Sequence, residues 1–235
     1  MLVYVKIRKT NEEREKSMRD LTLGQLYNKM LDEMGPQGWW PAESKVEIIL
    51  GAILVQNTNW KNVEKSLTNI KAITEFAPEK VSELNKEYLM SLILPSGFYQ
   101  NKSKAIIEIF QWLKKYRFDL KRMKEIYGEQ LHSQLLLLHG IGEETADVLL
   151  LYVFDEKVFI ADKYTQKLFT FLQVEGIKNY SSLKKLVPEL SHFTLNQAQE
   201  FHGLLDEFGK VYVKNQATFT ASFLAGYRLI LTNRK

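Results

Sequence analysis

Apolar side chains recur every three or four residues along most of this chain, which is the spacing of amphipathic helices. The pattern begins at residues 46–54. It predicts further helices over residues 106–113, 130–138, 144–154, 163–173, 181–190 and 195–211. Strict alternation of apolar and polar residues is confined to Leu2–Ile7, which could be a strand or equally a loose tail. Helices that follow one another without strands between them predict an all-α protein.

Glycine and proline mark the ends of the predicted helices, at Gly35-Pro36, Pro78, Pro95-Ser96-Gly97 and Gly140-Ile141-Gly142. Between them, no stretch has the composition of a flexible linker, and there is no internal repeat. The 235 residues are enough for one large domain or for two small ones. The pattern therefore leaves open a single domain or two lobes that share the chain discontinuously.

The composition narrows the possible chemistry and location. The chain has no cysteine, which excludes disulfides, thiolate zinc sites, cysteine-ligated iron–sulfur clusters and a cysteine nucleophile. Lys and Arg number 32 against 28 Asp and Glu, and this net charge of +4 is compatible with nucleic acid binding without proving it. The longest apolar run, Val148–Phe154, is far shorter than the roughly 20 residues of a membrane-spanning helix. Because Lys6 and Arg8 stand where a signal peptide is apolar, we expect a cytoplasmic protein with no membrane association.

The segment Leu135–Ala146 predicts a tight turn between two helices. Gly140 and Gly142 flank Ile141, whose side chain we expect to point inward and pin the two helices together. Backbone N–H groups at the start of the second helix would attract phosphate oxygens, as in a helix-hairpin-helix that grips a DNA backbone. The alternative is an αα-hairpin with a glycine turn and no ligand.

Asp162 follows the apolar stretch Val158–Ala161 and precedes a new amphipathic helix, eighteen residues after Glu144. This placement is typical of a helix N-cap, whose carboxylate accepts hydrogen bonds from the first turn. For an isolated aspartate, the capping role is the simpler interpretation.

These residues together resemble a known family. Leu138-x-Gly-Ile-Gly-x-x-Thr-Ala, followed at this spacing by Ile-Ala-Asp162, resembles the endonuclease III superfamily of DNA glycosylases. Gly51–Trp60 resembles the family's early helix and wedge loop, and Ser96–Ala105 its Gly-Tyr/Phe-x-x-x-Lys-Ala segment. The similarity runs from about residue 38 to 213. It implies two α-helical lobes with the active site in the cleft between them. We expect one lobe at 37–156, with the hairpin at about 130–154, and the other at 1–36 plus 157–235.

The resemblance also implies a reaction. Asp162 would stabilise the cationic sugar or activate water when the base of a flipped nucleotide is released from double-stranded damaged DNA. Glu144 stands where bifunctional relatives carry the lysine that attacks the sugar, so we expect base release without strand cleavage. The cysteine ligands are missing, so we expect no iron–sulfur cluster. We also expect the protein to be a monomer.

Aromatic residues indicate the substrate. Trp40, Pro41 and Trp60, with Glu144, would form a base pocket, because aromatic faces and a carboxylate favour a cationic alkylated purine. Tryptophan next to glycine and proline, the missing lyase lysine and Gln56-Asn57-Thr58 together resemble the 3-methyladenine DNA glycosylase branch of the superfamily. Either Trp39 or Trp40 could instead be a packing residue, and Trp40 is the better candidate for the pocket.

The remaining expected contacts are with DNA. Gln56 would fill the gap left by the flipped nucleotide, or be a polar residue in a helix C-cap turn. The other predicted DNA-binding residues are Asn57, Gly140, Ile141, Gly142 and Thr145, with Lys102 and Lys104 from the basic stretch Phe98–Lys124. By the resemblance, the carbonyls of Leu136, Leu138 and Ile141 could hold a monovalent cation. Two alternatives stay open: a glycosylase of this fold for an oxidised or mismatched base, and a DNA-binding protein without activity.

Overall fold

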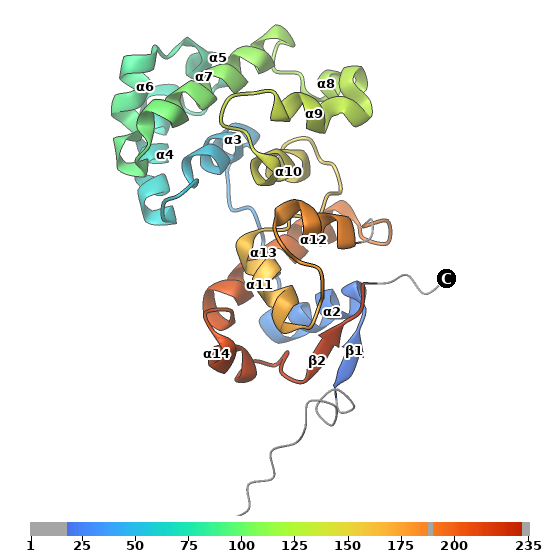
Figure 1. Cartoon of the computed structure of the whole chain (residues 1–235). Helices are drawn as coiled ribbons and strands as arrows, with labels where there is room; N and C mark the ends of the chain where they lie inside the picture. The colour runs from blue at the N-terminus through green and yellow to red at the C-terminus, as the bar shows by residue number, and fades with distance from the viewer. Residues whose placement is uncertain (1–17, 188–189, 232–235) are drawn as a thin grey trace, which may run out of the picture. The chain divides into compact units, whose positions relative to one another are not determined.

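The computed structural model describes residues 18–187 and 190–231, and helices dominate both ranges (Figure 1). The elements are β1 (Arg19–Leu21), α2 (Leu23–Met34), α3 (Lys45–Leu54), α4 (Trp60–Thr74), α5 (Pro78–Glu83), α6 (Lys86–Ile93), η1 (Leu94–Ser96), α7 (Tyr99–Lys115), α8 (Leu120–Tyr127), η2 (Gly128–Gln130), α9 (Leu131–Leu136), α10 (Glu143–Tyr152), α11 (Lys163–Phe171), α12 (Tyr180–Leu186), α13 (Leu195–Tyr212), α14 (Gln216–Thr220) and β2 (Tyr227–Leu229). The all-α prediction is confirmed. Leu2–Ile7, which the sequence leaves open as a strand or a loose tail, lies outside the described residues.

The described chain divides into two compact units. The central unit comprises residues 38–160 and 190–202, and the terminal unit comprises 18–37, 161–187 and 203–231. In the central unit, α3 packs against α10, α4 against α6, and α7 against α5 and α6. Every residue of α3 from Ile48 to Leu54 is buried, as is every residue of α10 from Thr145 to Tyr152. These two helices are therefore the inner pair, around which the amphipathic helices pack.

In the terminal unit, α2 begins with a capping box between Thr22 and Gln25. The strands β1 and β2 pair in parallel and join the two ends of the described chain, with Arg19 opposite Tyr227. Asp20 and Arg228 form an ion pair across this ladder, with 2.9 Å between Oδ1 and Nη2. Strands of three residues carry too short an alternation to be predicted from the sequence.

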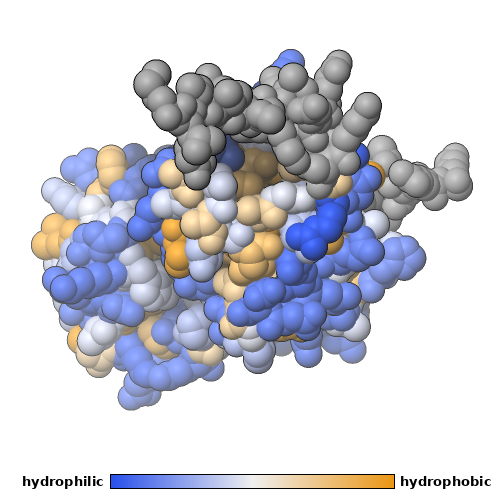
Figure 2. All heavy atoms as spheres, turned by 90° about the horizontal axis from the view of Figure 1, so that it is seen from below, coloured by the Kyte–Doolittle hydropathy of each residue, from blue (hydrophilic) through white to orange (hydrophobic). Residues whose placement is uncertain are grey.

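Across residues 18–187 and 190–231, no helix combines the length and apolarity needed to cross a bilayer. Figure 2 shows one face of the molecule, on which hydrophilic side chains predominate and apolar side chains lie in smaller groups between them.

Candidate functional site

The hairpin between α9 and α10 has the predicted inward-pointing residue. Ile141 is buried, and its N–H donates to the carbonyl of Leu138 at 3.2 Å. Gly140 has a φ of 75°, and a Cβ added there would lie 3.1 Å from the Cβ of Ala105 on α7. Both the left-handed backbone and this close approach require glycine. Gly142 is the N-cap residue of α10 and has no side chain, so the N–H groups of the first turn have no capping side chain as acceptor.

Gln56 joins the loop after α3 to this hairpin. Its Nε2 donates to the carbonyl of Gly140 and to Oγ1 of Thr145, at 3.1 Å in each case. The structure thus brings together three of the predicted DNA-binding residues. The next residue, Asn57, is exposed and has a φ of 54°. Nothing in the local sequence indicates these contacts, because Gln56 reaches partners more than eighty residues away.

Lys102 is inside the protein, so its interpretation as a phosphate-binding residue is wrong. Its side chain is 3% exposed, and Nζ donates to the carbonyls of Leu54 at 2.8 Å and Ser96 at 2.7 Å. Burial lowers the pKa of Lys102 to about 8. The sequence carried a signal for this placement, since Lys102 lies three and seven residues before the buried Ala105 and Ile109. Lys104 is exposed.

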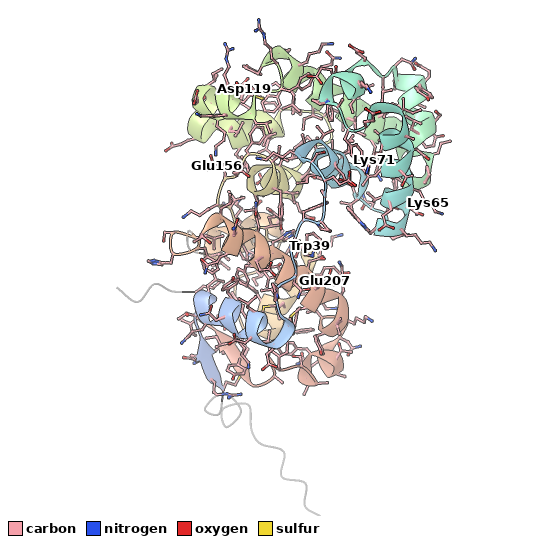
Figure 3. All side chains as sticks on the ribbon, turned by 180° about the vertical axis from the view of Figure 1, so that it is seen from behind. Trp39, Lys65, Lys71, Asp119, Glu156 and Glu207 are labelled. Carbon is pink, nitrogen blue, oxygen red and sulfur yellow. The ribbon has the colours of Figure 1, made fainter. Side chains whose placement is uncertain are left out.

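Trp40 and Trp60 meet in the central unit, with ring centroids 5.5 Å apart. Around them we define the aromatic cluster as Trp39, Trp40, Trp60, Tyr152 and His202. Trp39, labelled in Figure 3, lies in the loop before α3, and its ring meets that of Trp40 edge-on at 5.3 Å. No sequence motif contains Tyr152 or His202, which are fifty positions apart, so their contact is visible only in the structure.

A glycine lets this cluster lie against α3. A Cβ added at Gly51 would be 3.2 Å from Cζ2 of Trp40 and 3.5 Å from Cη2 of Trp60. Gly51 is helical, so it is the missing side chain, rather than backbone freedom, that allows the two indoles to approach. Pro41 follows Trp40 and is exposed.

Glu144 is exposed in the first turn of α10, next to Glu143. A carboxylate in this position is favoured by the positive end of the helix dipole. It offers an acceptor or a negative charge, but no amine that could form a Schiff base with a sugar.

Asp162 caps α11 in the terminal unit, which confirms the N-cap prediction. Its Oδ1 accepts a hydrogen bond from the N–H of Thr165 at 2.7 Å. The residue is 8% exposed, and burial raises the pKa of the carboxyl although hydrogen bonds from Thr165 and Tyr164 and the charge of Lys210 act to lower it. Lys210 itself is held by Asp206 at 2.6 Å and Glu207 at 2.8 Å. A buried carboxylate fixed in this way can stabilise a positive charge or orient a water.

The described residues hold no group of three or more His, Asp or Glu side chains that could bind a metal ion. The chain contains no cysteine, so a cysteine-ligated cluster cannot form. A monovalent cation on the carbonyls of Leu136, Leu138 and Ile141 stays a prediction.

Known proteins are similar in sequence to this chain over most of its length. A family model described as HhH-GPD superfamily base excision DNA repair protein matches residues 50–190. Putative DNA repair glycosylase MJ1434 of Methanocaldococcus jannaschii is 34% identical over 195 residues, which cover 82% of this chain and 89% of that protein. Endonuclease III of Thermotoga maritima is 26% identical over 176 residues, covering 72% of this chain and 75% of that protein.

Solved structures share the fold. A crystal structure of H. pylori 3-methyladenine DNA glycosylase bound to 1,N6-ethenoadenine has a TM-score of 0.65 and 30% identity, over 81% of this chain and 98% of that one. A trapped endonuclease III–DNA covalent intermediate has the same TM-score of 0.65 at 18% identity, over 81% and 85%, a likeness of fold alone.

Proposed function

Because the chain belongs to the HhH-GPD superfamily of base excision DNA repair proteins and is a DNA glycosylase, we propose that it releases alkylated purines such as 3-methyladenine. The observation that carries this proposal is the contact between Trp40 and Trp60 in the aromatic cluster. Indole faces stack on an extrahelical base, and they favour a base that carries positive charge. The similarity to the 3-methyladenine DNA glycosylase supports the same substrate class.

Asp162 is the catalytic residue of this proposal. Departure of the base leaves positive charge on the sugar, and an ionised carboxylate stabilises that charge or takes a proton from the attacking water. Its N-cap contacts keep the carboxylate in one orientation, so little reorganisation is needed during the reaction.

The product of this reaction is an intact strand with an abasic site. Glu144 occupies the position of the lyase lysine, and a carboxylate cannot form the Schiff base that leads to strand cleavage. Water is therefore the nucleophile. The carboxylate of Glu144 also favours a cationic purine over a neutral one.

Double-stranded DNA is the proposed partner of the hairpin. The uncapped first turn of α10, with Gly140, Ile141, Gly142 and Thr145 around it, would bind backbone phosphates independently of sequence. Gln56 and Asn57 would fill the space left by the flipped nucleotide, and Lys104 would add salt-dependent affinity. The protein acts as a monomer, with a monovalent cation on the hairpin carbonyls.

A panel of lesion duplexes tests the substrate class. We expect release of 3-methyladenine and 7-methylguanine from methylated DNA, and much slower release of oxidised pyrimidines or mismatched bases. Endonuclease III of T. maritima is also similar to this chain, which makes another lesion the second candidate. Preferential release of an oxidised or mismatched base would overturn the alkylpurine proposal. No release from any duplex would favour a DNA-binding protein without activity.

Trp40→Ala tests the observation that carries the proposal. Stacking on a flipped base contributes roughly 1–3 kcal/mol, whereas binding to an undamaged duplex uses backbone contacts. We therefore expect a large loss of excision with little change in the affinity for undamaged DNA. An equal fall in both, or an unfolded protein, would assign Trp40 to packing.

A further inference from the structure

We propose that Tyr152 and His202 are positioning residues, which hold the tryptophans of the aromatic cluster in the arrangement that receives the lesion base. This inference rests on the proposed function and extends it to two side chains that no sequence motif contains. Neither residue is assigned to touch the substrate. Their effect passes through Trp39 and Trp40.

The two side chains form a buried hydrogen-bonded pair. The hydroxyl of Tyr152, on α10, lies 2.8 Å from Nδ1 of His202, on α13. The residues are 4% and 8% exposed, so water competes little for this bond. The same hydroxyl is 3.1 Å from the backbone carbonyl of Gln199, one turn earlier on α13.

The two hydrogen bonds form together only when the imidazole of His202 is the donor to Tyr152. A carbonyl can only accept, so the single proton of the Tyr152 hydroxyl goes to Gln199. The hydroxyl oxygen must then accept from His202, which places a proton on Nδ1 of the imidazole. The ring of His202 is therefore fixed in orientation, because rotating it would remove the donor from Tyr152.

The pair contacts both tryptophans that precede α3. The ring of Tyr152 lies 5.7 Å from that of Trp40, at an interplanar angle of 68°. The imidazole of His202 lies 5.5 Å from Trp39, at 79°. Trp39 and Trp40 also meet edge-on, so the four rings close a circuit in which each ring contacts two others.

Packing alone does not require a polar pair at this place. An apolar residue at either position would avoid the cost of burying polar atoms. A hydrogen bond of fixed direction instead selects one ring orientation, which is how buried polar groups specify a unique arrangement. A further hydrogen bond, from Nε2 of Gln199 to the carbonyl of Leu151 at 3.0 Å, also joins α13 to α10.

Tyr152→Phe tests the inference, because it removes the hydroxyl and keeps the ring next to Trp40. Tyr127→Phe is the matched control: its hydroxyl is bonded to Tyr116 at 2.5 Å and to Nε1 of Trp112 at 3.3 Å, in a separate part of the central unit. We expect Tyr152→Phe to slow single-turnover release of 3-methyladenine about tenfold, because the loss of the buried hydroxyl frees the ring of His202 to reorient. Tyr127→Phe should change it less than about twofold.

Two further measurements separate positioning from stability. Quenching of tryptophan fluorescence by free 3-methyladenine should need about tenfold more base in Tyr152→Phe, while the affinity for undamaged duplex is unchanged. His202→Asn, which keeps an N–H donor, should retain more activity than His202→Leu. Combining Tyr152→Phe with His202→Leu should cost less than the sum of the two single losses, since both remove the hydrogen bond between these two residues.

The results distinguish this inference from the proposed function. If the wild-type protein releases another lesion, the alkylpurine proposal fails, and the same variants are measured with that lesion and its free base. If Tyr152→Phe behaves as Tyr127→Phe does in release and in quenching, the positioning role is overturned. Additive losses in the double variant would likewise contradict a shared function.

Discussion

Asp162 combines an observed role in the fold with the proposed role in the reaction. The carboxylate that begins α11 is also the group assigned to the reaction, and its bond to the N–H of Thr165 holds it in place. Burial raises its pKa, so the ionised form is less favoured than in water. Its cap and its chemistry can be separated experimentally, because asparagine caps a helix as well as aspartate does.

Asp162→Asn should therefore keep the fold and stop base release. We expect the single-turnover rate to fall by at least about 10²–10⁴, the range that general-base catalysis contributes. Affinity for the lesion duplex, measured by fluorescence anisotropy, should stay the same or rise with the loss of one negative charge. Release within a few-fold of the wild-type rate would remove Asp162 from the mechanism.

The pKa shift of Asp162 also predicts a pH dependence. In the proposed mechanism the ionised carboxylate is the active form, and its pKa is raised above the ordinary value of 3.8. The rate of base release should therefore begin to fall at a pH clearly above 3.8 as the solution is acidified. Rates measured in duplexes that remain paired over this range would show this fall in base release. A constant rate down to that pH would contradict the assignment of Asp162.

At the scale of elements, periodicity accounts for what the sequence could predict. α3 and α10 were predicted because their apolar residues follow the helical spacing, and the hairpin because glycine is required at its turn. Pairing between β1 and β2 joins residues about two hundred positions apart, so no local sequence pattern predicts it. The same holds for Gln56 on the hairpin and for Tyr152 with His202. Residue type alone favours a DNA contact for Lys102, whereas its helical spacing places it on the buried face of α7.

Gly140→Ala should destabilise the hairpin. Alanine would be strained at a φ of 75°, and its Cβ would crowd Ala105. We expect a loss of about 1–3 kcal/mol in the free energy of unfolding. Gly142→Ala is the control, because its φ is −93° and no atom lies within 4 Å of an added Cβ. Equal stability of the two variants in urea would show that the turn tolerates a side chain.

Lys102 should make stability depend on pH in the alkaline range. Its pKa is about 8 in the folded protein and 10.5 as the ordinary value, so between these the unfolded chain holds the proton and the folded one does not. Raising the pH therefore favours the folded state, and the free energy of unfolding should rise from pH 8 to 10.5. Lys102→Met should lack this increment in urea titrations. The same pH slope in both proteins would contradict the burial of the amine.

At the scale of the whole molecule, the later part of the chain packs without disulfides or a cysteine-ligated cluster, because the sequence has no cysteine. Phe201 stacks on Phe193 at 5.6 Å in the central unit, and Phe208 meets Phe223 at 5.3 Å in the terminal unit. Such contacts need no metal and no redox state. Stability should therefore be insensitive to chelators and reductants.

We expect the protein to release bases without cutting the strand. Borohydride added during turnover should trap no protein–DNA adduct, because Glu144 cannot form a Schiff base. Strand breaks should appear only after alkali or an abasic-site nuclease is added. Glu144→Lys serves as the comparison, since it restores an amine at this position. A borohydride-stable adduct with the unmodified protein would show that another lysine attacks the sugar, and Lys210 would be substituted first.

The two hydrogen bonds of Gln56 set a condition on when it can leave the hairpin. If Gln56 fills the space beside a flipped nucleotide, as proposed, it must give up the Gly140 carbonyl and the Thr145 hydroxyl. An intact base pair offers no replacement, whereas a widowed base opposite the lesion presents its own donors and acceptors. The two hydrogen bonds that Gln56 loses are therefore replaced only where a nucleotide has left the base stack. On undamaged duplex we therefore expect the amide to stay on the hairpin and the base stack to remain undisturbed.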